Sequence, residues 1–234
     1  MDTSMQSSAV TLLTGTQAQR ELKAACQDGR LREFLGEGCW PPSKGEQARL
    51  DNLIERLDLV RPELVYRLSV LLLCFEKKKA AEAAKQLKVD NNLRSQVYMA
   101  VMLTDDLYFV QTPLAMKRFL VEYGTERYEF LEDVLKQQRK LFDQSEGRIL
   151  ARLTMIEEFK RCSIPVFAED LAVTVQDLIE AGIPADKAED ILMKLLDVVH
   201  VKPADNKRDF LLKKGKLFYK VPLAAGLRKV QWTK

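Results

Sequence analysis

Apolar residues recur along this chain at the spacing of one helix face, and that period constrains the fold more than any other feature. The clearest case follows Pro62, where Leu64, Leu68, Leu71 and Phe75 fall on one broad face. Pro62 itself suits a first helical turn, where a backbone N–H would have no partner. The 234 residues include only 10 Gly and 8 Pro, which disfavours a loop-rich or all-β chain. We therefore predict an all-α fold, a multi-helix bundle or array with a small helical tail subdomain.

Local signals place several helix starts. Asp90 precedes a helix with a stripe of apolar residues, and its carboxylate can accept from the first turn. Thr112 followed by Pro113 pairs an N-cap hydroxyl with a proline at the first helical position. Thr174 and Asp177 have the spacing of a capping box. Each of these patterns predicts a helix that begins at the next residue.

Lysines 77–79 come directly after the apolar stretch that ends at Phe75. Because the carbonyl end of a helix favours positive charge, we expect these lysines to close that helix. Near the chain end, Asp205 is expected to open a last helix in which Phe210, Leu211 and Leu212 are buried.

The chain is expected to divide into four regions. Residues 1–45 form a polar segment with short helices and a Gly/Pro linker, and within it we expect residues 1–16 to be disordered or loosely attached. A helical body spans 46–162, a helical tail subdomain spans 163–218, and a basic extension spans 219–234.

Charge is unevenly distributed along the chain. The net charge is only +3, yet residues 202–234 hold ten Lys and Arg against two Asp, a local charge of +8. The rest of the chain carries −5. A basic tail on an acidic body is typical of a polyanion-binding protein, although a solvated terminal helix has the same composition.

Catalytic patterns are missing from the sequence. Cys26, Cys39, Cys74 and Cys162 form no CxxC pair, which favours free thiols in a reducing cytoplasm. His200 is the only histidine, so no metal cluster or nucleophilic centre can be assembled, and we expect it to be a packed residue. No phosphate-binding loop, secretion signal or membrane span is found. We expect no cofactor, no membrane partner and no enzyme activity from this chain alone.

A family resemblance carries more specific information. A moderately specific motif in the C-terminal half comprises residues 170–179, 182–184, 191–196 and 206–212. Two less specific helical segments precede it, at 87–92 and 112–119. These segments together resemble the neck, body and tail of bacterial CCA-adding enzymes, which are tRNA nucleotidyltransferases. The family's catalytic head has no counterpart here, and Cys74-Phe75 stands where some relatives have a His-Asp pair. Val175, Asp186 and Glu189 stand about where the family has glycines.

The resemblance implies a non-catalytic protein that binds tRNA in the cytoplasm through contacts to its backbone. The expected contacts are exposed basic residues of the matching helices: Lys88, Arg94, Lys117, Arg118, Arg208, Lys213 and Lys214. Three alternatives stay open. The chain is a helical interaction scaffold that has lost RNA binding, or it joins a separately encoded nucleotidyltransferase head, or it is a shortened gene product.

Overall fold

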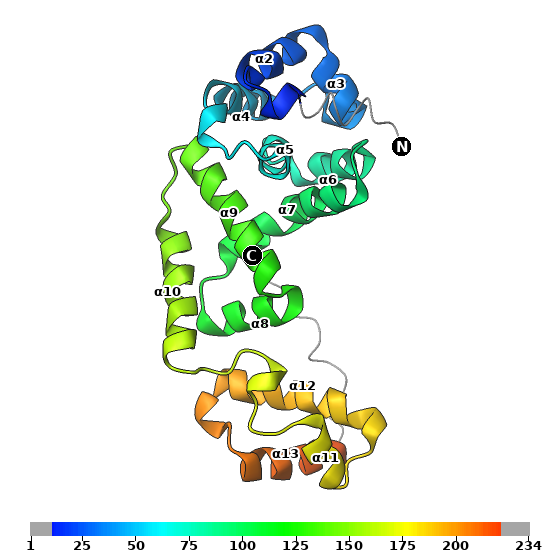
Figure 1. Cartoon of the computed structure of the whole chain (residues 1–234), viewed down its shortest axis with the longest axis vertical. Helices are drawn as coiled ribbons and strands as arrows, with labels where there is room; N and C mark the ends of the chain where they lie inside the picture. The colour runs from blue at the N-terminus through cyan, green and yellow to red at the C-terminus, as the bar shows by residue number, and fades with distance from the viewer. Residues whose placement is uncertain (1–10, 221–234) are drawn as a thin grey trace. The chain divides into compact units, whose positions relative to one another are not determined.

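The computed structural model describes residues 11–220, and this part of the chain is helical, with no strand (Figure 1). The all-α prediction is confirmed. The described residues form two compact units. Unit 1 runs to Phe109 and includes Glu126–Ile149, and unit 2 combines Val110–Thr125 with the residues from Leu150 onward. This division differs from the expected body and tail, because residues 110–125 belong to the unit that contains the tail.

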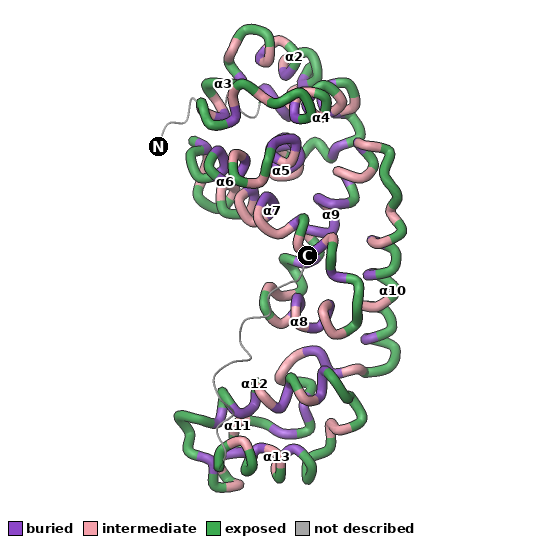
Figure 2. The backbone as a smooth tube through the Cα atoms, turned by 180° about the vertical axis from the view of Figure 1, so that it is seen from behind, coloured by how far each residue is buried: buried purple, intermediate pink, exposed green. Residues whose placement is uncertain are grey.

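The helices of unit 1 are α2 (Ala18–Asp28), α3 (Arg30–Leu35), α4 (Lys44–Glu55), α5 (Leu64–Leu72), α6 (Lys77–Gln86), α7 (Asn91–Phe109) and α9 (Thr125–Leu141). The three consecutive helices α5, α6 and α7 pack on one another and form its centre (Figure 1). Helix α5 is buried over most of its length, as the tube in Figure 2 shows. The helical apolar period read from the sequence therefore marks the centre of this unit's core.

Residues 11–16 are held more firmly than the polar N-terminal sequence predicts. Leu12 and Leu13 are buried in the core of unit 1. The Leu13 carbonyl accepts a 2.6 Å hydrogen bond from Arg67, whose buried guanidinium also donates to the Val60 carbonyl at 3.3 Å. Because a buried charge needs such partners, this segment contributes to the fold. The expectation of disorder was wrong for residues 11–16, and residues 1–10 lie outside the described part.

The three lysines 77–79 begin α6 and do not close α5. Glu46 of α4 contacts the start of α6: its fully buried carboxylate accepts from the Glu76 backbone N–H at 2.9 Å and from Lys79 Nζ at 2.9 Å. The same carboxylate accepts from the Ser43 N–H at 2.7 Å and completes the capping box of α4. One anion thus satisfies the first turns of two helices, and it offsets the lysines at the positive end of α6.

Unit 2 contains α8 (Pro113–Tyr123), most of α10 (Gly147–Arg161), α11 (Val175–Glu180), α12 (Ala185–Val201) and α13 (Arg208–Lys220). Helix α12 is the centre of its core, and α11 and α13 pack against it. Gly215 allows α13 to lie close, since a Cβ there would meet Leu178 at 3.1 Å. Leu211 is buried as expected, but Phe210 is exposed because the buried face of α13 runs through Leu211 and Gly215.

Three of the predicted helix starts are confirmed, whereas Asp205 belongs to a short 3-10 helix and α13 begins at Arg208. The Leu93 N–H donates to Asp90 at 2.9 Å, and the Ala115 N–H donates to Thr112 at 3.2 Å. Thr174 and Asp177 form the capping box of α11. In residues 11–220, no helix combines the length and hydropathy needed to cross a membrane. Nor do the side chains described there include a group of His, Cys, Asp and Glu suited to hold a metal.

Candidate nucleic-acid interface

The motif that carries the family resemblance forms a network of hydrogen bonds inside unit 2. Asn206 accepts from the Ala172 N–H at 2.8 Å and donates to the Asp170 carbonyl at 2.9 Å. Arg208 Nη1 lies 2.5 Å from Oδ1 of Asp177. These polar residues join the segment before α11 to the start of α13. Their geometry gives them a structural role in holding the tail helices together.

Asp177 concentrates several of these contacts. The Thr174 N–H, the Arg208 guanidinium and the Thr174 hydroxyl all donate to its carboxylate and lower its pKa to about 2. Arg208 is exposed, but its guanidinium is engaged with this carboxylate. A phosphate would therefore compete with Asp177 for Arg208, which makes Arg208 a weaker contact than the sequence predicts.

Lys117 does not lie on a surface. Only 3% of the residue is exposed, and its ammonium donates to the carbonyl of His200 at 3.1 Å. The ring of Phe159 lies 5.6 Å from the same nitrogen. Burial lowers the pKa of Lys117. Its cation sits against a carbonyl of the last turn of α12, where a helix favours positive charge, so Lys117 is removed from the set of expected RNA contacts.

His200 is packed inside unit 2, as expected. Its Nε2 atom lies 2.8 Å from the Val166 carbonyl, while Nδ1 is buried without a hydrogen-bond partner. Burial lowers the pKa of His200, and the nearby Lys117 cation lowers it further. The imidazole is therefore neutral near pH 7 and acts as a structural group.

The remaining expected contacts fall on different elements. Lys88 is exposed after α6, and Arg94 is half-buried in the first turn of α7, where it donates to Asn91. Both belong to unit 1, whereas Arg118 of α8 belongs to unit 2 and is half-buried. The seven residues therefore do not form one patch within either unit.

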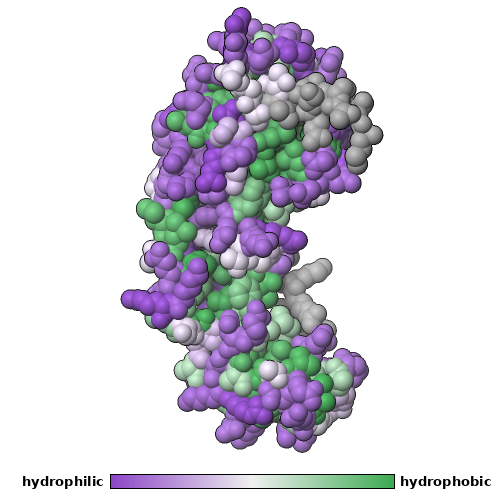
Figure 3. Space-filling model, viewed as in Figure 1, coloured by the Kyte–Doolittle hydropathy of each residue, from purple (hydrophilic) through white to green (hydrophobic). Residues whose placement is uncertain are grey.

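The exposed face of α13 is the most basic helix surface of unit 2. Lys213, Lys216 and Lys220 lie on one stripe, at spacings of three and four residues. Phe210 and Leu217 are also exposed on this helix. Figure 3 shows hydrophobic surface directly beside hydrophilic surface where α11, α12 and α13 lie.

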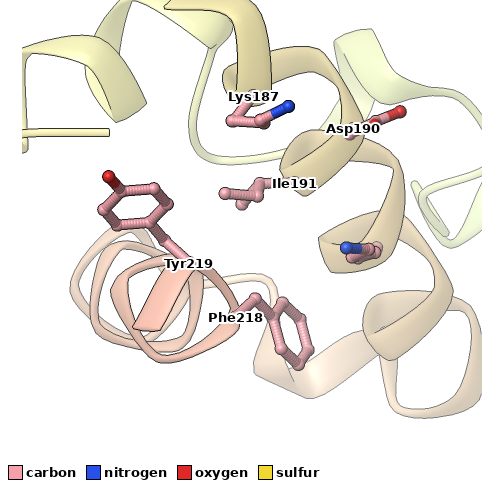
Figure 4. Close-up of a pocket in the computed structure, with 6 residues that line it drawn as sticks. Lys187, Asp190, Ile191, Phe218 and Tyr219 are labelled. Carbon is pink, nitrogen blue, oxygen red and sulfur yellow. The ribbon is translucent and has the colours of Figure 1, made fainter. Parts of the chain in front are cut away.

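Lys214, which was also expected to bind RNA, does not belong to this stripe and lies beside Phe218. It is half-buried, and its ammonium lies 5.4 Å from the centroid of the Phe218 ring. This contact places Lys214 near a surface pocket of about 210 Å³ between α12 and α13. In Figure 4, Phe218 and Tyr219 project from α13, and Ile191 projects from α12 toward them.

Two lysines complete the pocket from the α12 side. Lys187 and Lys194 line it together with Asp190. The pocket therefore combines two aromatic rings with two ammonium groups, the residue types that bind bases and phosphates. Sequence reasoning missed Lys187, Lys194 and Tyr219. The available signal was the seven-residue spacing of the two lysines, which puts them on one face of a helix.

Two of the positions where the family has glycine carry exposed carboxylates. Asp186 and Glu189 are exposed on the first turns of α12, and Asp186 lies 3.4 Å from Lys187. Both carboxylates oppose an anion near the start of α12. The stripe on α13 is therefore better suited to phosphate than the start of α12.

Comparisons with protein-family models, with curated proteins and with solved structures find no match. The resemblance to CCA-adding enzymes thus rests on the motif residues alone. What the chain binds has to be inferred from the geometry of its own side chains.

Proposed function

We propose that this chain is a non-catalytic RNA-binding protein that contacts the RNA backbone with the basic stripe of α13. The observation that carries the proposal is the alignment of Lys213, Lys216 and Lys220 on one exposed face beside a pocket with two further lysines. None of the three stripe lysines has an ion-pair partner among the described residues. Their charges are therefore available to neutralise phosphates.

The dimensions of the stripe suit a polyanion. Lys213 and Lys220 are seven residues apart, about 10 Å along the helix axis, so the stripe spans more than one phosphate. A surface of this kind contacts the RNA backbone and recognises its shape and charge, as proteins that bind double-stranded RNA do. The choice of tRNA within this class is supported by the family resemblance of residues 170–212.

The test is a titration of fluorescein-labelled tRNA with the full chain at salt concentrations from about 50 to 200 mM. The informative variant is Lys213→Glu with Lys216→Glu, because neither side chain supports the fold. Arg208→Glu is avoided, since it would break the contact with Asp177. A matched control is Lys23→Glu with Lys44→Glu, which makes the same charge change at exposed positions of unit 1.

The proposal expects binding in the micromolar range or tighter that weakens with salt, together with a loss of at least tenfold in the stripe variant. The control should retain most of the affinity. Equal losses in both variants would mean that net charge alone drives binding, and no binding by the unchanged chain would exclude the tRNA function.

A second candidate is a helical protein-interaction scaffold. It is favoured by the apolar residues that unit 2 leaves exposed, among them Val201 at 69% and Leu217 at 50%. Such side chains in a chain without RNA affinity mark a protein-binding surface. A chain that fails to bind tRNA, but whose partner binding is lost on Leu217→Ser, would support this second candidate.

A further inference from the structure

A cluster of aromatic and guanidinium groups in unit 1 shares no residue with the α13 stripe or with the seven expected contacts. The Tyr108 ring, at the end of α7, has two arginine side chains over it. The guanidinium carbon of Arg139 lies 4.0 Å from the ring centroid, and that of Arg148 lies 4.2 Å from it. Each distance is well inside the range of a cation–π contact. Three helices supply the groups, namely α7, α9 and the start of α10.

The two guanidinium groups form a concentrated positive charge. Because both lie within 4.2 Å of one centroid, Arg139 and Arg148 are no more than about 8 Å apart. No carboxylate forms an ion pair with Arg139 within residues 11–220. The electron-rich faces of Tyr108 attract both cations but carry no net charge. An anion close to Arg139 would be favoured.

Phe109 gives the cluster a free aromatic surface. It is 67% exposed, although a phenylalanine normally buries most of its ring. Its ring stands at 75° to that of Tyr108, with centroids 5.3 Å apart, and Arg148 lies 6.0 Å from its centroid. An exposed ring edge-on to a cation-covered ring offers one flat face for stacking.

We propose that Tyr108, Phe109, Arg139 and Arg148 form a binding site for an unpaired nucleotide of single-stranded RNA. The base stacks on Phe109, and the phosphate contacts the guanidinium group of Arg139, while Arg148 adds positive charge on the same Tyr108 ring. A stacking ring beside basic groups is the arrangement that single-stranded nucleic acids require, and it is indifferent to sequence. This site does not depend on the α13 stripe, so either proposal can fail without the other.

The experiment measures binding of 5′-fluorescein-labelled 12-nucleotide oligo(A) RNA to the full chain and to single variants. Phe109→Ala removes the stacking face and should weaken binding about 5- to 150-fold, because stacking of one base contributes about 1–3 kcal/mol. Leu59→Ala is its control, since Leu59 is another exposed apolar residue of unit 1. Arg139→Ala is compared with Lys140→Ala, an exposed neighbour on α9 that carries the same charge.

A second readout reports stacking directly. Phe109→Trp introduces an indole whose emission a stacked base quenches, and the difference from the unchanged chain isolates this ring. We expect quenching on addition of oligo(A), a loss of affinity in Phe109→Ala and Arg139→Ala, and near-normal binding by both controls. The proposal is overturned if Phe109→Ala binds within twofold of the unchanged chain, if Arg139→Ala equals Lys140→Ala, or if the new indole is not quenched.

Discussion

The guanidinium of Arg208 lies 2.5 Å from the carboxylate of Asp177, and this contact joins the first residue of α13 to the capping box of α11. The same carboxylate accepts from the Thr174 N–H at 2.8 Å. Asp177 therefore connects two helices and caps one of them. Several polar residues of the motif that resembles CCA-adding enzymes form the contacts between these helices.

Removing this contact should destabilise unit 2. Arg208→Ala is expected to lower the apparent melting temperature measured by circular dichroism at pH 7, while Lys207→Ala, an exposed neighbour, should leave it nearly unchanged. The folded-state pKa of Asp177 is about 2, below its ordinary 3.8. Its contribution is therefore present above pH 3.8 and is lost as pH falls toward 2. The difference between Arg208→Ala and the unchanged chain should shrink over that interval; a constant difference would contradict this role of Asp177.

Glu46 should be one of the most sensitive positions of unit 1. In Glu46→Gln, one oxygen and an amide replace the carboxylate that accepts from Ser43, Glu76 and Lys79. At least one buried donor then loses its acceptor, and we expect a loss of about 1–3 kcal/mol in the free energy of unfolding. Urea denaturation measures it, with Glu55→Gln as the control on an exposed part of α4. Equal midpoints for the two variants would show that the buried carboxylate contributes nothing.

Mild acid should destabilise unit 2 through His200. Its folded-state pKa lies below the ordinary 6.5, because burial disfavours the imidazolium and Lys117 and Arg118 repel it, although Asp197 favours it. A neutral His200 stabilises the fold above pH 6.5, and this contribution falls as pH drops toward the folded-state pKa. His200→Gln should therefore flatten the change in melting temperature between pH 7 and pH 5. An unchanged slope would exclude His200 as its source.

Close packing of α13 should tolerate no larger residue at Gly215. A Cβ there would lie 3.1 Å from Leu178 and 3.4 Å from Ile183, so Gly215→Val adds two methyl groups beyond an already tight contact. We expect a cost of about 1–3 kcal/mol in the free energy of unfolding. Lys216→Val is the control for helix propensity, since Lys216 is exposed on the same helix. Should the two variants unfold at the same urea concentration, α13 would not be packed as described.

Features encoded by neighbouring residues could be predicted from the sequence. Asp90, Thr112 and the pair Thr174 and Asp177 cap helices through contacts three residues away, and all were located correctly. The apolar period likewise identified α5 as a core helix. These signals depend only on the geometry of one helix turn.

Features that depend on distant contacts could not be predicted in this way. Lys79 donates to Glu46, which lies 33 positions earlier, and Lys117 is buried against a carbonyl of α12 that lies 83 positions later. Both lysines look like surface residues in a one-dimensional pattern. The stacking of Arg139 on Tyr108 is also a contact between separate helices, and the spacing of residues within one helix does not predict it.

The salt dependence of tRNA binding tests the central claim most directly. The slope of log affinity against log salt concentration is measured for the full chain and for Lys213→Gln with Lys216→Gln, which remove two positive charges from α13. If the stripe binds phosphates, the slope should become shallower by roughly 0.7–0.9 for each phosphate that is no longer neutralised, and the affinity should fall. A slope identical to that of the unchanged chain would show that α13 does not bind the RNA backbone.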